Sequence, residues 1–188
     1  MKSLCVFCGS SLGGNSAHEE AAKLLGNYLA THEIRLVYGG GDVGLMGVIA
    51  NAVLSNGGEA IGVITKALLQ KEVGHQGLTQ LHIVDTMHER KAMMAILSDG
   101  FIAIPGGFGT LDELFEVLTW LQLGIHHKPI GILNVEGYFD HLLDFLSHTV
   151  DEGFVHEAHL EMLKVSSSVT ELVHRMWIDE SPIVDKWL

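Results

Sequence analysis

Short apolar runs alternate with amphipathic segments along most of this chain of 188 residues. The apolar runs have the length of strands and lie at residues 4–8, 35–38, 60–64, 81–84, 101–104 and 129–133. The segments between them have helical spacing and lie at residues 16–30, 45–56, 88–97, 111–123 and 138–151. Such alternation is typical of βαβ units, in which helices cover both faces of a parallel sheet. The sequence therefore predicts an α/β fold with a doubly wound, mostly parallel sheet.

Composition limits the size of the fold and the kind of partner. With 47% hydrophobic and 18% charged residues, residues 1–188 are expected to form one domain with a sizeable core. Eleven basic residues against 23 acidic ones give a formal net charge of -12 with the histidines neutral. Because such a surface repels nucleic acid and anionic membranes, we expect neither as a partner. A phosphorylated ligand then needs local positive potential from a few basic side chains and from helix N-termini.

The start of the chain indicates a cytoplasmic protein. Its apolar run is too short for a signal peptide, and no stretch reaches the roughly 18 apolar residues of a membrane span. Cys5 and Cys8 have the CxxC spacing of a redox pair, but such pairs usually open a helix, and these two lie in an expected strand. We expect them to be buried, with their side chains on opposite faces of that strand.

Residues 105–113, PGGFGTLDE, have the composition of an anion-binding turn. They follow the expected strand at 101–104 and lead into a helix. The glycines let the backbone approach a ligand, and a helix N-terminus near Thr110 presents free N–H groups to an anion. Glu113 then places a carboxylate in the first helical turn. The sequence therefore predicts a phosphate site with an acid beside it.

A second glycine-rich turn, YGGGDVGLMG at residues 38–47, contains a G-x-G-x-x-G match. In a dinucleotide site, an acid at the end of the following strand holds the ribose, but here the nearest candidate, Glu59, precedes that strand. Gly40 and Gly41 are therefore expected to form a second wall around a mononucleotide. A purely structural tight turn is the alternative.

The first expected strand ends in Gly9, Ser10 and Ser11. Ser10 is expected to add N–H and hydroxyl donors to the same cleft, because the carboxyl ends of parallel strands meet at one edge of the sheet. The alternative is a plain turn before a helix that is capped near Asn15 or Ser16.

Arg90 and Lys91 form a notable basic pair in an acidic chain. They lie at the expected start of a helix, where cations are unfavourable unless an anion is bound. Arginine can clamp a phosphate or carboxylate at two points, and lysine adds a point charge. The pair therefore indicates an anion site, with a solvated helix start as the alternative.

Glu113 and Glu116 share one face of the helix that follows the phosphate turn. Two close carboxylates repel each other, which raises the pKa of one and suits it to proton transfer. A solvated acidic face is the alternative for Glu116.

Histidines at positions 126, 127, 156 and 159 invite comparison with a metal site. No third and fourth ligand stands at a supporting spacing, so we expect surface or helix-capping histidines. No metal and no cofactor is predicted.

Together these segments resemble the LONELY GUY (LOG) family of cytokinin riboside 5′-monophosphate phosphoribohydrolases. Residues 105–113 have the form PGGxGTxxE, residues 87–91 (MHERK) resemble its companion motif, and the turns at 8–11 and 38–47 are also similar. The resemblance covers roughly residues 3–165. It implies a Rossmann-like homodimer that hydrolyses the N-glycosidic bond of a nucleoside 5′-monophosphate, a cytokinin riboside monophosphate or AMP. The products are a free base and ribose 5-phosphate.

The resemblance also implies roles for single residues. Arg90 and Glu113 match the catalytic positions. Positions that match substrate-binding ones are Glu72, Lys91, Thr119 and the turn residues Gly107, Phe108, Gly109, Thr110, Leu111, Asp112 and Glu113. The arguments from the residues themselves add Ser10, Gly40, Gly41, Gly106 and Glu116 to the predicted binding set.

Members of this family were long labelled lysine decarboxylases, and the residues speak against that activity. Pyridoxal-phosphate chemistry needs a Schiff-base lysine and a partner for the pyridinium nitrogen, and no segment looks like that pair. The alternative function is a non-catalytic carrier of a nucleotide or cofactor, because related folds with similar glycine turns bind without turnover.

Overall fold

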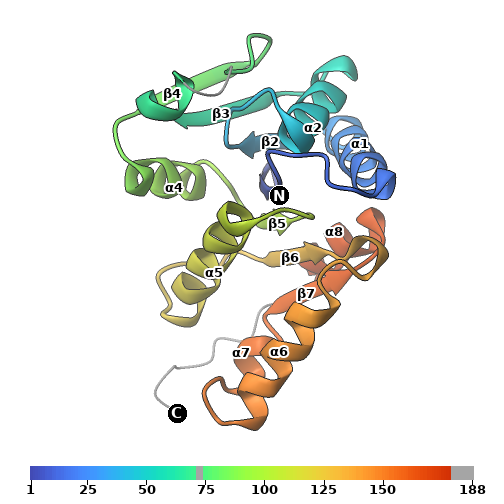
Figure 1. The fold of residues 1–188 in the computed structure, drawn as a ribbon, viewed down its shortest axis with the longest axis vertical. Coiled ribbons are helices and arrows are strands. Elements are labelled where there is room, and N and C mark those ends of the chain that lie inside the picture. The colour runs from blue at the N-terminus through green and yellow to red at the C-terminus, as the bar shows by residue number, and fades with distance from the viewer. Residues whose placement is uncertain (71–73, 179–188) are drawn as a thin grey trace.

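A computed structural model describes residues 1–70 and 74–178. Within these ranges one sheet holds the strands β1 (Ser3–Phe7), β2 (Arg35–Tyr38), β3 (Ala60–Thr65), β4 (Gln80–Val84), β5 (Phe101–Ala103), β6 (Ile130–Leu133) and β7 (Leu163–Ser166). Across the sheet their order is β4-β3-β2-β1-β5-β6-β7, and every neighbouring pair is parallel. Figure 1 shows these strands with the helices packed around them. The predicted doubly wound, parallel sheet is confirmed.

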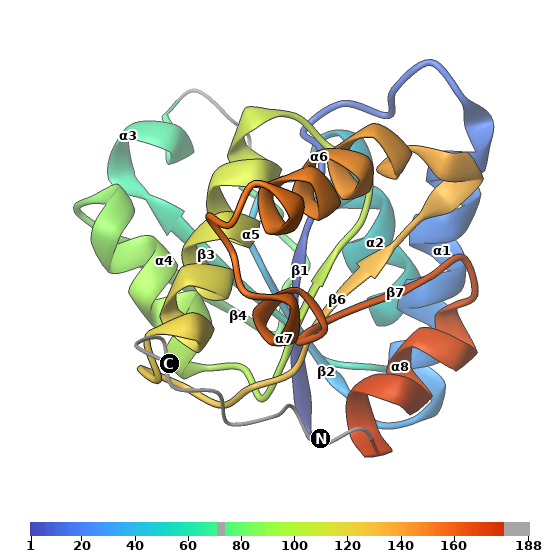
Figure 2. The same cartoon turned by 90° about the horizontal axis from the view of Figure 1, so that it is seen from below.

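Helices cover both faces of the sheet, as predicted (Figure 2). Their bounds are α1 (Ser16–Thr31), α2 (Gly44–Ser55), α3 (Lys66–Leu69), α4 (Met87–Ile96), α5 (Phe108–Gln122), the 3₁₀ turn η1 (Val135–Gly137), α6 (Asp140–Asp151), α7 (Glu157–Leu160) and α8 (Val169–Ile178). Helices α1, α2 and α8 pack against one face, and α4, α5 and α6 pack against the other.

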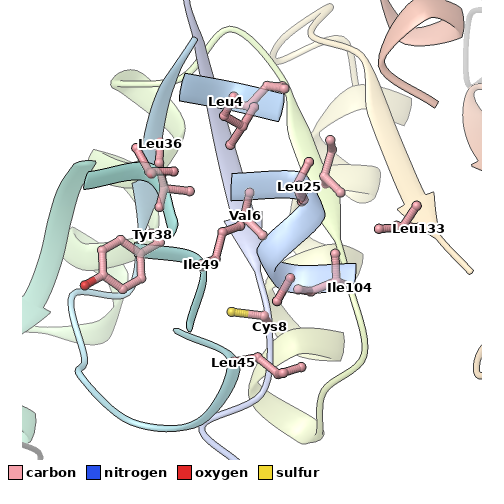
Figure 3. Close-up of a cluster of buried hydrophobic side chains, with 14 of the residues drawn as sticks. Leu4, Val6, Cys8, Leu25, Leu36, Tyr38, Leu45, Ile49, Ile104 and Leu133 are labelled. Atoms are coloured by element: carbon pink, nitrogen blue, oxygen red, sulfur yellow. The ribbon is translucent and has the colours of Figure 1, made fainter. Parts of the chain in front are cut away.

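Burial on both faces explains why the strands carry near-continuous apolar runs. Alternate side chains of β1 enter different cores: Leu4 and Val6 lie in one, and Cys5 lies in the other. Figure 3 shows the first core, which brings Val6 together with Leu25 of α1 and Ile49 of α2. Each core therefore joins the central strand to the helices of one layer.

The position of the functional crevice follows from the topology. From β1 the chain continues to β2, β3 and β4 on one side, and from β5 it continues to β6 and β7 on the other. Helix α1 after β1 and helix α5 after β5 lie on opposite faces of the sheet. A crevice therefore opens between the carboxyl ends of β1 and β5, where open α/β sheets bind their ligands.

The six predicted strands are all present, and each end lies within one residue of its expected position. Two helix starts were wrong. Helix α5 begins at Phe108 instead of residue 111, because Gly107 supplies an extended N-cap with φ -99° and ψ -150°. Glu113 therefore lies in the second turn of α5. Helix α6 begins at Asp140 instead of residue 138, because Glu136 and Gly137 adopt left-handed backbone angles, with φ of 49° and 70°.

The C-terminal part contains the helices α7 and α8 and the strand β7, beyond the last element that the sequence analysis predicted. Strand β7 was not predicted, because Lys164 interrupts its short apolar run. In the ranges that the structure describes, no helix is both long and apolar enough to cross a membrane.

Candidate active site

A cavity of about 210 Å³ opens at the carboxyl ends of β1 and β5. Its walls come from the turn after β1, the turn after β2, the short helix α3 and the starts of α4 and α5. The lining residues are Val6, Cys8, Gly9, Ser10, Gly39, Met46, Leu68, Arg90, Gly107, Phe108, Gly109, Thr110 and Glu113. Segments that are more than 100 residues apart in the chain thus meet at one site.

The N-terminus of α5 forms one wall of this cavity. The amide of Leu111 donates to the Gly107 carbonyl at 3.1 Å, so the N–H groups that precede Leu111 have no acceptor within the helix. The side chain of Thr110 is buried, and its Oγ1 atom has no hydrogen-bond partner among the described residues. Free amides, the positive end of the helix dipole and an unsatisfied buried hydroxyl together suit an anion such as a phosphate.

Gly106 packs directly behind this wall. A Cβ atom at Gly106 would collide with Thr110 Oγ1 and would lie 2.8 Å from the Gly9 amide nitrogen. At Gly107 and Gly109 a Cβ atom would meet nothing within 4 Å. Gly106 is therefore required by protein packing, whereas Gly107 and Gly109 border open space beside the helix N-terminus.

Glu113 lies in the wall of the cavity with a side chain that is only 11% exposed. Burial raises the pKa of its carboxyl group to about 7, against the lowering effect of Arg90 and with a further increase from Asp112. Repulsion by Glu116 contributes in the predicted direction, but it is a smaller cause than burial. The raised pKa is therefore chiefly a desolvation effect, which helical spacing alone did not indicate.

Arg90 extends from α4 into the same cavity and is also buried. Its Nε donates to the Val63 carbonyl at 2.9 Å, and its Nη2 donates to the Gly39 carbonyl at 3.2 Å. The remaining Nη1 lies 3.9 Å from Glu113 Oε1, which is too long for a hydrogen bond. The guanidinium is thus fixed by two backbone carbonyls, and its Nη1 atom forms a long ion pair with the Glu113 carboxylate but no hydrogen bond. The solvated helix start, the alternative for this position, is wrong for Arg90.

Lys91 joins α4 to α5 outside the cavity. Its Nζ lies 3.1 Å from Asp112 Oδ2 and 3.0 Å from Glu116 Oε1. Partial burial opposes the charge of Lys91, but the bonds to Glu116 and Asp112 prevail and raise its pKa. Glu116 Oε2 is buried without a partner among the described residues, so the solvated acidic face suggested for Glu116 is wrong. Lys91 therefore neutralises the two acids that flank Glu113.

Two other predicted binding residues, Leu111 and Thr119, are not among the residues that line the cavity. Leu111 packs against the apolar core beneath α5. Thr119 is exposed and donates to the Phe115 carbonyl of its own helix at 2.7 Å. Phe108 is 92% exposed at the first position of α5, although it borders the cavity. Glu72 lies outside the described residues.

The turn after β2 contributes Gly39, which the sequence analysis did not select. The Arg90 guanidinium occupies the place of a Cβ at Gly39. The Gly40 carbonyl accepts from the His75 amide, and the Gly41 carbonyl accepts from the Tyr38 hydroxyl. Gly40 and Gly41 are thus bonded within the protein and are not among the lining residues. The only signals for the contact between Gly39 and Arg90 in the sequence were the basic pair at positions 90 and 91 and the glycine-rich turn itself.

The turn after β1 borders the cavity and leads into a capped helix. Ser10 lines the cavity, and Asn15 caps α1 by accepting from the Ala17 amide at 3.0 Å. Cys8 also lines the cavity, and burial together with the nearby Glu113 raises the pKa of its thiol. Cys5 and Cys8 are buried in the two different cores, as predicted.

Three of the four histidines that were compared with a metal site have structural partners. His156 caps α7 by accepting from the Ala158 amide, and His126 Nε2 lies 3.1 Å from the Val117 carbonyl. His159 is buried beside Gln122, so the surface or capping position expected for it is wrong. Within the described ranges, no group of three or more histidine, cysteine or acidic side chains is arranged to hold a metal ion.

Comparison with known proteins shows the family of this chain. Residues 46–176 match the family model described as "Possible lysine decarboxylase". The chain is 49% identical to the cytokinin riboside 5′-monophosphate phosphoribohydrolase LOG1 of Arabidopsis thaliana, over 93% of this chain and 82% of that protein. It is 48% identical to the probable cytokinin riboside 5′-monophosphate phosphoribohydrolase LOGL9 of Oryza sativa subsp. japonica, over 92% of this chain and 76% of that protein.

Solved structures agree on the fold. The structure of TM1055 superposes with a TM-score of 0.71 at 20% identity, covering 93% of this chain and 97% of that chain. A molybdenum cofactor carrier protein from Chlamydomonas reinhardtii gives a TM-score of 0.67 at 20% identity, covering 89% and 91%. Identities this low show a common fold alone. The relatives at nearly half identity go further: the chain belongs to the LOG family of cytokinin riboside 5′-monophosphate phosphoribohydrolases.

Proposed function

We propose that this protein hydrolyses the N-glycosidic bond of a nucleoside 5′-monophosphate to a free base and ribose 5-phosphate. The observation that carries the proposal is one cavity that is bordered by both the N-terminus of helix α5 and the buried carboxyl group of Glu113. The activity named for the similar LOG1 protein supports it. The substrate is a cytokinin riboside monophosphate or AMP.

In the proposed mechanism the 5′-phosphate lies on the free amides from Gly107 to Thr110 and on the Thr110 hydroxyl. This contact holds the sugar so that its C1′ atom faces Glu113. As the bond from C1′ to the base nitrogen breaks, positive charge develops on the ribose, and the Glu113 carboxylate stabilises it. Glu113 also takes a proton from the water whose oxygen attacks C1′.

The leaving base receives the proton that Glu113 takes from the attacking water. Water supplies the hydroxyl on C1′, and its proton passes from Glu113 through solvent to the base nitrogen. Glu116 is poorly placed to deliver that proton, because Lys91 holds one of its oxygens and Glu116 does not border the cavity. Arg90 holds the ribose or the leaving base and keeps the Glu113 pKa from rising further.

A lysine decarboxylase is not supported by this site. No lysine is among the described residues that line the cavity. Lys91 is bonded to two carboxylates, which raise its pKa, whereas a Schiff-base lysine needs a lowered one.

We expect a cytoplasmic homodimer. Large apolar side chains on α4, on α5 and just after α5 are exposed and would be covered by a second copy: Met87, Ile96, Phe108, Phe115 and Leu123. Where exposed apolar side chains form one contiguous patch, they are typical of a protein interface. Sedimentation at micromolar concentration should give twice the mass of 20.5 kDa; a single species at the monomer mass would contradict the dimer.

The phosphate requirement tests the function directly. Incubation with AMP should release adenine, and adenosine should react at least about 100-fold more slowly in kcat/KM, because binding of the remote phosphate aligns the reacting sugar. Chromatography of the free base measures both rates. Equal rates on AMP and adenosine would remove the phosphate site from the mechanism. Tight AMP binding with no adenine would instead support the nucleotide carrier, and a panel of nucleoside monophosphates would then identify the preferred base.

The pH dependence follows from Glu113. Its carboxyl group must be ionised to accept a proton from water, and its pKa in the folded protein is about 7. We therefore expect kcat/KM for AMP to rise with pH through a midpoint near that value and to level off above it. A rate that falls through the same range would mean that Glu113 acts as an acid.

A further inference from the structure

The peptide between Gly106 and Gly107 joins two glycines, so its backbone can rotate more freely than others in the turn. The carbonyls on either side of it are held by the main chain: Pro105 accepts from the Gly9 amide at 3.1 Å, and Gly107 accepts from the Leu111 amide at 3.1 Å. The Gly106 carbonyl is held by a side chain instead. It accepts a 2.6 Å hydrogen bond from the hydroxyl of Tyr138.

This bond fixes the direction of an amide as well as a carbonyl. In a trans peptide the C=O of one residue and the N–H of the next point in opposite directions, and the chain has no cis peptide bond in its described part. Tyr138 lines a second cavity of about 320 Å³ that lies next to the first and shares Gly9, Ser10 and Gly107 with it. Since the Gly106 oxygen is bonded to Tyr138, the Gly107 N–H points away from the Tyr138 hydroxyl, and Gly107 itself borders the first cavity.

The backbone that delivers Tyr138 is unusual. The preceding residues, Glu136 and Gly137, both lie in the left-handed region, which is costly for a residue with a side chain such as Glu136. The turn is held in this shape by Asn134, which accepts from the Phe139 amide at 2.9 Å and donates to Asp140 at 2.7 Å. Such strain persists where the surrounding contacts require it, and here it places Tyr138 against the phosphate turn.

The ring of Tyr138 is fixed from two sides. It meets the ring of His18 edge-on at 5.3 Å and the ring of Phe139 edge-on at 4.9 Å. The residue is nevertheless 46% exposed, so its hydroxyl bond adds little to the stability of the fold. We therefore expect Tyr138→Phe to keep the fold, and the loss of the bond to Gly106 should instead weaken ligand binding.

We propose that Tyr138 is a positioning residue for the phosphate site: its hydroxyl holds the Gly106–Gly107 peptide in the orientation that presents the Gly107 N–H to the 5′-phosphate. The inference rests on the proposed function, since it takes the anion at the start of α5 to be the substrate phosphate. Tyr138 does not touch the substrate. It acts through the backbone amide that does.

The test compares Tyr138→Phe with Tyr28→Phe. Tyr28 lies on α1, where it stacks on His32, so its variant also removes one tyrosine hydroxyl but away from the cavity. Calorimetry with ribose 5-phosphate should show about tenfold weaker binding to the Tyr138 variant, the scale of one lost hydrogen bond. The Tyr28 variant should bind like the original protein. In kinetics, kcat/KM for AMP should fall by a similar factor in Tyr138→Phe while that for adenosine stays unchanged.

The outcomes separate the two proposals. Ribose 5-phosphate binding that is equal in the original protein and Tyr138→Phe would overturn the role of Tyr138. So would an equal loss of activity on AMP and adenosine, because that is the signature of general structural damage. If the original protein binds ribose 5-phosphate but releases no base from any nucleotide, the hydrolase proposal fails while the binding comparison still decides the role of Tyr138. An original protein that releases adenine from AMP but binds no ribose 5-phosphate would overturn the role of Tyr138 and leave the hydrolase proposal standing.

Discussion

Replacing Glu113 by glutamine is expected to lower kcat on AMP by about 100-fold or more, the usual scale for a lost acid–base group. Glutamine keeps the size and much of the polarity of the side chain but accepts no proton and carries no charge. The phosphate contacts at the start of α5 are unchanged, so AMP should still bind with similar affinity. Calorimetry and single-turnover base release would measure the two effects separately.

The same variant has a predicted effect on stability that runs in the opposite direction. Burial raises the Glu113 pKa from 4.5 to about 7, so the folded protein favours the neutral carboxyl group. The stability that this group contributes is present below pH 4.5 and is lost as the pH rises through about 7. At pH 8 the melting temperature of Glu113→Gln should therefore equal or exceed that of the original protein. Any gain in melting temperature should become smaller as the pH is lowered.

A matched control is available at the other end of the sheet. Glu59 forms a 2.7 Å ion pair with Arg35, and both side chains are largely exposed. Glu59→Gln removes the same charge without approaching the cavity and should leave turnover unchanged. A Glu113→Gln protein with near-normal turnover would show that another group performs the chemistry.

Replacing Arg90 by methionine is expected to reduce kcat/KM on AMP by about 100-fold or more at pH 7, because both its positioning and its charge are lost. The Val63 and Gly39 carbonyls lose their donors, which frees the turn that borders the cavity. Since Arg90 lowers the pKa of Glu113, that pKa should rise above about 7 in the variant. The pH profile of kcat/KM should therefore move to higher pH.

Lysine at position 90 separates the two effects. Arg90→Lys keeps a positive charge but cannot reproduce the fixed two-point geometry, so the rate should fall while the midpoint of the pH profile stays near that of the original protein. Arg35→Met provides the matched control on the surface ion pair and should change neither quantity. An Arg90→Met profile with an unshifted midpoint would contradict the electrostatic coupling to Glu113.

Local patterns explain why much of the fold was predictable. Apolar runs of strand length and helical spacing between them predicted six strands and the layers on both faces. The elements that were missed are short or irregular. Strand β7 contains Lys164, and the shift in the start of α6 depends on two left-handed residues that the sequence marks only by Gly137.

Those parts of the candidate site that have a local sequence signal were predictable. The turn at residues 105–113 indicated an anion site, and Ser10 and Arg90 border the same cavity. Contacts between distant segments were harder. Gly39 was passed over in favour of Gly40 and Gly41, because the sequence does not show which glycine of the turn lies against Arg90. Tyr138 was placed in a helix, so its bond to Gly106 was not expected.

The sequence by itself determined the parallel α/β arrangement and the edge of the sheet where the glycine turns gather, because both follow from local periodicity and strand direction. It also determined that an acid follows the phosphate turn. Only the tertiary structure decided that Arg90 Nη1 lies 3.9 Å from Glu113 Oε1 and that Lys91 forms ion pairs with Asp112 and Glu116. It also decided that the Tyr138 hydroxyl donates to the Gly106 carbonyl. It likewise decided that burial, more than repulsion, raises the pKa of Glu113. Desolvation and distances between remote segments are properties of the packed chain, and no local pattern encodes them.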